Sequence, residues 1–197
     1  MNIGIYGGSF NPVHKGHIKL AEYVISELSL DRLFVIPAYV SPFKNERQVP
    51  VQDVINMCRL AFRNEKTEIL TLEAERKGKS YTVDTLNEII KLCGDNNYSL
   101  IVGSDQFVKF NKWYCFEEIL SKAELCTVSR DFNNGIEELK EFAEKNISPF
   151  GKYRICDFSP LEISSSEIRE KLCKGEDVSE FLSEEVLRYI KDRGLYK

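Results

Sequence analysis

The beginning of the chain constrains the fold more than any other stretch. Residues 2–6 form a short β-branched and aromatic run that stops at Gly7 and Gly8, as a buried strand does before a tight turn. Beyond the turn, apolar residues recur at helical spacing from His17 onward: Ile18, Ala21, Val24, Ile25 and Leu28. A strand, a glycine-rich loop and a helix in this order predict the first unit of a parallel α/β sheet.

The same alternation continues along the chain. Further strands are expected at residues 33–36, 68–73, 98–102, 125–128 and 153–157, and helices at residues 53–62, 82–93 and 136–145. A serine run then opens a helix that stops at Gly175, and a final helix stops at Gly194. The pattern predicts an α/β fold with a Rossmann-like, doubly wound parallel sheet. It also predicts a single domain over residues 1–197, in which residues 164–197 form a small helical cap.

Charge and composition exclude several classes of protein. The chain has 27 Lys and Arg against 31 Asp and Glu and a net charge of −4, which argues against binding nucleic acid or a membrane through bulk charge. Residues 1–10 do not resemble a secretory signal, and no apolar run is long enough to span a bilayer. We therefore expect a cytoplasmic protein without nucleic-acid or membrane partners. The six cysteines are far apart, and we expect them to be reduced and structural.

The loop after the first strand, GGSFNPVHKGH, contains the only two histidines of the chain, His14 and His17. A metal site would need a third ligand, which the spacing does not suggest, and core histidines occur singly more often than in pairs. The favoured interpretation is that both imidazoles and the N-terminus of the following helix bind an anion such as a nucleotide phosphate. The loop is neither a GxGxxG nor a Walker A motif.

These residues resemble a known signature. GGSFNPVHKGH is similar to the HxGH motif of the nucleotidyltransferase superfamily, and ISSSEIREKL at residues 163–172 resembles its second motif, ISSTxIR. Three further segments, RKGKSYTVDTL, IVGSDQFVKFNKWYCFEEIL and VLRYIKDRGLYK, resemble bacterial nicotinate-nucleotide adenylyltransferases. The resemblance covers essentially the whole chain. Pantetheine-phosphate adenylyltransferases share the HxGH loop but not the SYT and GxD…W segments.

The resemblance implies the nucleotidyltransferase fold and transfer of AMP from ATP to nicotinate mononucleotide, with Mg²⁺ bridging the triphosphate and no metal site made of protein ligands. It implies catalytic roles for His14, His17 and Arg169. The residues implied to bind ATP are Gly7, Gly8, Ser9, Phe10, Lys44, Gly103, Asp105, Arg130, Ser165 and Ser166. Those implied to bind the mononucleotide are Tyr81, Thr82, Trp113 and Lys44.

Simpler interpretations stay open for several of these residues. Ser164 and Glu167 form the pattern of a capping box, beside which Arg169 is merely solvated. Asp105 equally suits a helix cap, Trp113 suits packing, and Lys44 suits a solvated surface.

The sequence also departs from the family pattern. Phe43 replaces a histidine, Asp131 and Phe132 replace the Pro-Gly that usually follows Arg130, and Ser9 and Asn11 replace Thr and Asp. The alternatives are therefore a sister enzyme that uses nicotinamide mononucleotide or phosphopantetheine, or a nucleotide-binding module without catalysis. A homo-oligomer is compatible with the sequence.

Overall fold

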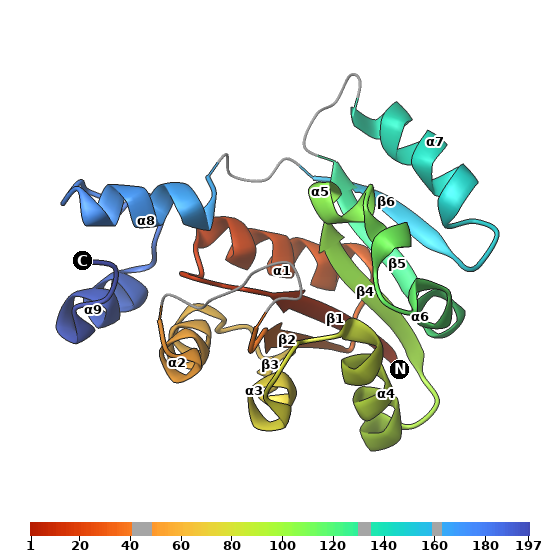
Figure 1. The fold of residues 1–197 in the computed structure, drawn as a ribbon, viewed down its shortest axis with the longest axis horizontal. Coiled ribbons are helices and arrows are strands. Elements are labelled where there is room, and N and C mark those ends of the chain that lie inside the picture. The colour runs from red at the N-terminus through yellow and green to blue at the C-terminus, as the bar shows by residue number, and fades with distance from the viewer. Residues whose placement is uncertain (41–48, 130–134, 159–162) are drawn as a thin grey trace.

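The computed structural model describes residues 1–40, 49–129, 135–158 and 163–197. Its centre is a parallel sheet with the strand order β3-β2-β1-β4-β5-β6 (Figure 1). The strands are β1 (Asn2–Gly8), β2 (Arg32–Pro37), β3 (Thr67–Ile69), β4 (Asn97–Gly103), β5 (Glu124–Ser129) and β6 (Tyr153–Asp157). This order is that of a Rossmann-like, doubly wound sheet, so the predicted fold class is confirmed.

Helices cover both faces of the sheet, and each face has its own buried cluster. One cluster includes side chains of α1 (Lys15–Glu27), α2 (Val51–Ala61), α8 (Ser165–Cys173) and α9 (Glu184–Arg193). The other includes side chains of α4 (Thr82–Cys93), α5 (Ser104–Phe107), the 3₁₀ helix η1 (Phe110–Lys112), α6 (Phe116–Lys122) and α7 (Gly135–Asn146). The short α3 (Leu72–Arg76) follows β3.

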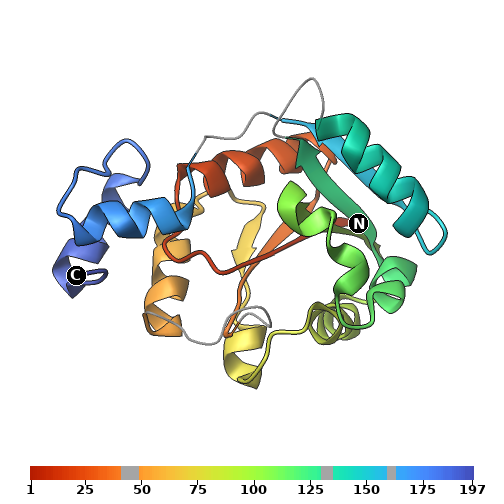
Figure 2. The same cartoon turned by 45° about the horizontal axis from the view of Figure 1, so that its top comes forward.

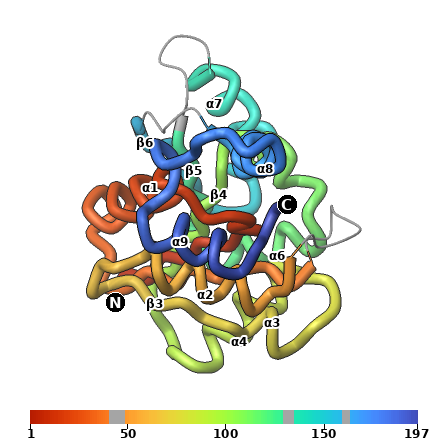
Figure 3. Tube along the Cα trace, turned by 90° about the vertical axis from the view of Figure 1, so that its left-hand side faces the viewer, coloured from red at the N-terminus to blue at the C-terminus, as the bar shows by residue number. Residues whose placement is uncertain are grey.

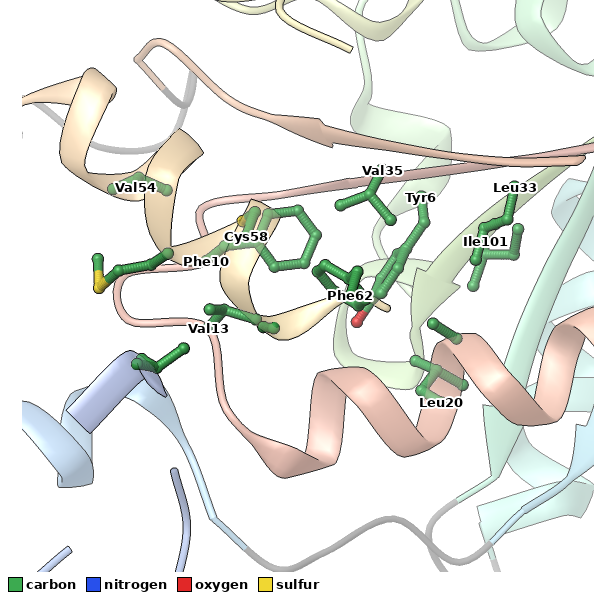
Figure 4. Close-up of a cluster of buried hydrophobic side chains, with 14 of the residues drawn as sticks. Tyr6, Phe10, Val13, Leu20, Leu33, Val35, Val54, Cys58, Phe62 and Ile101 are labelled. Atoms are coloured by element: carbon green, nitrogen blue, oxygen red, sulfur yellow. The ribbon is translucent and has the colours of Figure 1, made fainter. Parts of the chain in front are cut away.

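Strand β1 lies in the middle of the sheet and sends alternate side chains to the two clusters. Ile3 and Ile5 belong to one and Tyr6 to the other. Gly4, between the two isoleucines, has no room for a side chain, because an added Cβ would come within 2.5 Å of the Leu30 side chain. The Leu30 side chain therefore packs directly against the backbone of β1. Figure 4 shows the cluster on this face, in which Tyr6, Leu33 and Ile101 lie between the sheet and α1.

The helices α8 and α9 lie beside α1 and α2 and apart from α7 (Figure 2). Seen from their own side, α9 lies against α2 (Figure 3). Polar contacts join these elements. The Tyr189 hydroxyl donates to Asp53 Oδ1 at 2.8 Å, and the Lys15 main-chain N–H donates to the Phe181 carbonyl at 2.8 Å. The cap predicted over residues 164–197 therefore packs on α1, which follows β1, and on α2, which follows β2.

Most predicted elements are present within one or two residues, but the strand predicted at residues 68–73 is wrong. Strand β3 ends at Ile69, and Leu72–Arg76 forms α3. The sequence LEAER consists of strong helix formers. In addition, the helix carries Glu73 to a buried position, where the Thr85 hydroxyl donates to its carboxylate at 2.8 Å. Tertiary burial of a hydrogen-bonded carboxylate thus overrides the alternating pattern.

The start of α1 and the short helix α6 also differ from the prediction. Helix α1 begins at Lys15, two residues before the expected start, because His14 occupies the N-cap position. Helix α6 was not predicted. Among the described residues, no helix has the length and apolarity that crossing a bilayer requires.

The prediction of structural cysteines holds for three of them. Cys58, Cys126 and Cys156 are buried, whereas Cys115 and Cys173 are exposed, so packing does not explain these two.

Candidate active site

The site lies where β1 and β4, neighbours in the sheet, reach their carboxyl ends at Gly8 and Gly103. The chain leaves β1 toward α1 on one face and leaves β4 toward α5 and α6 on the other. Such a reversal of strand order opens a crevice at the carboxyl ends of a doubly wound sheet, and ligands bind there.

A cavity of about 510 Å³ occupies this position, and we call it the central cavity. It brings together six predicted site residues: Gly7, Gly8, Ser9, Tyr81, Thr82 and Trp113. Residues to which the sequence analysis assigned no role also line it, among them Glu73, Ser80, Thr85, Gln106, Lys112 and Tyr114. Its volume suits a small organic molecule.

One wall of the central cavity is aromatic. Trp113 ends the 3₁₀ helix η1 and packs on buried Phe110, with ring centroids 4.9 Å apart. The rings of Tyr81 and Tyr114 lie 5.0 Å apart, and Tyr114 is exposed. A supported indole beside an open space offers a flat surface on which a heteroaromatic ring can stack.

A helix N-terminus forms a second part of the cavity. Tyr81 is the N-cap of α4, and Thr82 is the first residue of this 12-residue helix. The main-chain N–H groups of a first turn have no partner within the helix and point out of its end, where the helix dipole favours an anion. A carboxylate carried by an aromatic ring is therefore a suitable ligand here.

Buried polar residues lie behind that helix N-terminus. Arg76 Nη2 donates to Thr85 Oγ1 at 2.9 Å, and the Thr85 hydroxyl donates to Glu73 Oε1 at 2.8 Å. Ser80 also hydrogen-bonds to the Glu73 carboxylate, and burial raises the pKa of that carboxyl despite these bonds. Ser80 and Thr85 belong to the SYTVDTL segment already singled out, which was the available signal, whereas Glu73 was hidden in a wrongly predicted strand.

The start of the loop after β1 is shaped by one aromatic side chain. Phe10 has a left-handed backbone (φ 43°), and its ring is buried against Tyr6 and Phe62 (Figure 4). A Cβ on Gly8 would come within 2.9 Å of the Phe10 ring, whereas a Cβ on Gly7 would meet nothing within 4 Å. The side chain of Phe10, a predicted ATP-binding residue, therefore belongs to the core, and its ring also packs edge-on against His17, with ring centroids 5.1 Å apart.

The two histidines follow in what we call the histidine loop, residues 9–14, and the first turn of α1. Their rings lie 3.7 Å apart, and His14 is buried. The His14 main-chain N–H donates to Nδ1 of His17 at 3.2 Å. A neutral His17 then carries its proton on Nε2, so this atom is a hydrogen-bond donor.

The second motif lies against the histidine loop. Ser165 Oγ donates to the Pro12 carbonyl at 2.9 Å, and Arg169 Nη1 donates to the Asn11 carbonyl at 2.7 Å. Arg169 Nη2 also donates to Ser166 Oγ at 3.1 Å. Arg169 is therefore not merely solvated, and the two motifs, far apart in sequence, form one site.

The capping box predicted from the same motif is also present. The Glu167 main-chain N–H donates to Ser164 Oγ at 3.2 Å, and the Ser164 main-chain N–H donates to Glu167 Oε2 at 2.8 Å. Hydrogen bonds from Ser164 lower the pKa of the Glu167 carboxyl. The box fixes the direction of α8, so capping and a phosphate-binding role for its first turn are compatible.

The remaining predicted residues lie at the end of β4 or outside the described residues. Asp105 is exposed in α5, where Gln106 Nε2 donates to its Oδ2 at 2.9 Å, and of the two only Gln106 lines the central cavity. A Cβ on Gly103 would come within 2.8 Å of Asp105 Oδ1. Lys44, Phe43 and Arg130 fall outside the described residues.

The donor set indicates what each part can hold. Within the described parts of the chain, no group of three or more His, Cys, Asp or Glu side chains has the arrangement of a metal site. Around the histidine loop the donors are imidazole, guanidinium and hydroxyl groups, which suit phosphate oxygens. The molecule thus has an aromatic cavity with a helix end whose free N–H groups suit an anion, next to a loop whose donors suit phosphate.

Comparisons with known proteins show the family of the chain. The profile of the cytidylyltransferase-like family matches residues 5–171. A probable nicotinate-nucleotide adenylyltransferase of Fusobacterium nucleatum is 35% identical over 97% of this chain and 97% of its own length. The corresponding protein of Aquifex aeolicus is 37% identical over 83% of this chain and 98% of its own length.

A solved structure has the same fold. Plasmodium falciparum nicotinic acid mononucleotide adenylyltransferase, complexed with NaAD, superposes with a TM-score of 0.81 at 22% identity, covering 99% of this chain and 97% of its own. The similarity in fold alone would not assign the chain to a family, but the similarity in sequence over nearly the full length of the relatives does. The chain belongs to the cytidylyltransferase-like family and, within it, to the nicotinate-nucleotide adenylyltransferases.

Proposed function

We propose that this enzyme transfers the adenylyl group of ATP to nicotinate mononucleotide, giving nicotinate adenine dinucleotide and pyrophosphate in the synthesis of NAD. One observation carries the proposal. The central cavity, with Trp113 and the N-terminus of α4, shares Gly7–Ser9 with the loop that leads to His14 and His17. A nicotinate ring in the cavity and a triphosphate on the histidine loop would thus meet over the glycines.

The chemistry needs positioning more than activation. A phosphate oxygen of the mononucleotide attacks the α-phosphorus of ATP, the bond from that phosphorus to the bridging oxygen of the β-phosphate breaks, and the electron pair leaves with pyrophosphate. The attacking phosphate is already an anion, so neither a covalent intermediate nor a strong base is required. The work of the site is to align two anions and stabilise the charge that develops on the leaving group.

We assign the triphosphate to the histidine loop and α8. The Nε2–H of His17 would donate to phosphate oxygens, with His14 beside it. A guanidinium has more N–H donors than the two that Arg169 gives to Asn11 and Ser166, so it can add a phosphate ligand. The first turn of α8 supplies main-chain N–H groups near Ser165.

Magnesium fits this scheme as a companion of ATP. The described side chains that contact the histidine loop are imidazole, guanidinium and hydroxyl groups without a carboxylate, so phosphates and water would provide most of the ligands of the ion. When bound, Mg²⁺ supplies charge neutralisation across the triphosphate. The chain's own residues then hold the nucleotide and stabilise the leaving pyrophosphate.

We assign selection of the acid form of the mononucleotide to the N-terminus of α4. Main-chain N–H groups near Tyr81 and Thr82 favour a carboxylate over a neutral carboxamide. Lys112, which also lines the central cavity, adds positive charge. Each of these features favours nicotinate over nicotinamide.

The assignment makes residues 1–197 one functional unit. The hydrogen bonds of Ser165 and Arg169 to the histidine loop support the view that α8 completes the site and is not part of a separate module. This supports a single nucleotidyltransferase domain.

The test is release of pyrophosphate from ATP and Mg²⁺ with three acceptors at equal concentration: nicotinate mononucleotide, nicotinamide mononucleotide and phosphopantetheine. The expected result is rapid release with nicotinate mononucleotide and at least tenfold lower kcat/KM with the other two. Faster release with another acceptor would make the enzyme a sister nucleotidyltransferase. ATP binding without release with any acceptor would make the protein a binding module.

A further inference from the structure

The histidine loop is held by a residue that neither motif contains. After α9 the chain turns at Gly194, which is left-handed, and the Leu195 main-chain N–H donates to the Ile190 carbonyl at 3.0 Å. Tyr196 follows with φ 63°, a conformation that costs energy for a residue with a side chain. Its ring is buried in the cluster that contains α1 and α2. The turn thus fixes the Tyr196 side chain in one place.

The Tyr196 hydroxyl donates a hydrogen bond to Oδ1 of Asn11. Asn11 lies in the histidine loop, and its carbonyl accepts the bond from Arg169. The side chain and the main chain of one loop residue are therefore both held from residues 164–197. Cys173 Sγ lies 3.4 Å from the Tyr196 carbonyl, which ties the same residue to the end of α8.

The two tethers of Asn11, the hydrogen bonds from Arg169 and from Tyr196, would respond differently to a bound nucleotide. Arg169 faces competition, because a triphosphate attracts the guanidinium that now donates to the Asn11 carbonyl. The bond between Tyr196 and Asn11 joins two neutral groups and gives no charge to the ligand. It can therefore persist while Arg169 turns to phosphate.

We propose that Tyr196 is a positioning residue for adenylyl transfer: its hydroxyl holds Asn11 and thereby keeps the histidine loop in the geometry that the phosphates of ATP require. The inference rests on the proposed function for the location of ATP. The tyrosine hydroxyl needs only an acceptor, and the amide oxygen of Asn11 supplies one.

The variant Tyr196→Phe tests the hydroxyl and leaves the buried ring in place. Tyr189→Phe is the matched control, because it also removes a tyrosine hydroxyl bonded near α9. That hydroxyl lies between Asn56 and Asp53, away from the histidine loop. The melting temperatures of both variants show whether a loss of activity comes from a less stable protein or from a displaced histidine loop.

For Tyr196→Phe we expect kcat/KM for ATP to fall about 5- to 10-fold, which corresponds to one hydrogen bond, while KM for nicotinate mononucleotide stays within about twofold. Tyr189→Phe should leave both parameters within about twofold of wild type. Equal kinetics for the two variants would overturn the proposal, as would a loss that falls on the mononucleotide alone.

A double-mutant cycle with Asn11 sharpens the test. Asn11→Ala should reduce kcat/KM for ATP, Asn11→Asp should retain more of it because the acceptor remains, and Tyr196→Phe should cost little in the Asn11→Ala background. Additive losses would overturn the proposal. Failure of the proposed function is distinguishable, since wild-type enzyme would then release no pyrophosphate. In that case, binding of a non-hydrolysable ATP analogue to the same variants still tests the tether.

Discussion

The two halves of the site are built in different ways. In the central cavity the polar residues bond to one another behind the surface, as Arg76, Thr85 and Glu73 do, and leave about 510 Å³ of space in front. Around the histidine loop the proposed ligand-binding groups bond to the loop itself, as Arg169 and Ser165 do. A ligand can enter the cavity without breaking these bonds, whereas a ligand of the loop comes next to donors that already bond to the loop.

The two kinds of construction suit different tasks: the cavity suits binding of the mononucleotide, and the loop suits acceleration of the reaction. A preformed cavity gives affinity and selectivity for a flat ring, because little has to be ordered when the ring enters. A self-bonded loop holds charged donors in place before the reaction, and such preorganised donors act on the transition state. We therefore expect substitutions in the cavity to change KM for the mononucleotide and substitutions around the loop to change kcat.

The largest effect is expected from His17→Ala, which should lower kcat by about 100-fold or more through loss of one transition-state contact. His17→Asn is the matched control, because an asparagine can still accept the His14 main-chain N–H at the N-terminus of α1. Steady-state pyrophosphate release measures both. If His17→Asn restored most of the rate, His17 would serve as a helix cap alone, and the contrast between the halves would fail.

A smaller effect, confined to the other half, is expected from Trp113→Ala. Loss of the stacking surface should raise KM for nicotinate mononucleotide about tenfold and leave KM for ATP within about twofold, since stacking of a ring on an aromatic side chain contributes about 1–3 kcal/mol. Trp113→Phe retains a smaller ring, so its KM for nicotinate mononucleotide should lie between the values of wild type and Trp113→Ala. Equal increases in both KM values would show that Trp113 supports the site as a whole.

The smallest effect is expected from Glu73→Gln, and it concerns stability. A carboxyl whose pKa is raised on folding stabilises the protein fully below its ordinary value of 4.5, and this contribution is lost as the pH rises through the folded pKa. Glutamine keeps an acceptor for the Thr85 hydroxyl and does not ionise. The melting temperature of the variant should therefore rise above that of wild type by a few °C as the pH increases from 4 to 8. A constant difference across this range would contradict the assigned cause.

The fold was predictable wherever local signals agreed. The helix predicted over residues 82–93 has those bounds, with Gly94 as its C-cap, and the strand predicted over residues 153–157 is β6. The strand predicted over residues 68–73 was wrong because alternation of polar and apolar residues over so few positions does not show that Glu73 will be buried against Thr85. Likewise, the two motifs of the site, GGSFNPVHKGH and ISSSEIREKL, were recognisable because each is a continuous segment of the sequence.

The contacts that assemble the site were not predictable. Asn11 meets Tyr196 and Arg169 only because α8 and α9 pack beside α1 and α2. Neither residue type nor spacing contains that information, since tyrosine and asparagine are usually surface or packing residues. Phe10 shows the converse: it belongs to the motif, yet its ring serves the core.

The contacts between the histidine loop and residues 164–197 span 153, 158 and 185 positions of the chain. Closing segments of that length carries a large entropic cost, which is met late in folding, after local contacts and neighbouring strands have formed. The single tryptophan belongs to the cluster on the opposite face of the sheet. In refolding, its fluorescence should recover before catalysis does, so the order in which the chain folds makes the enzyme's activity the last property it acquires.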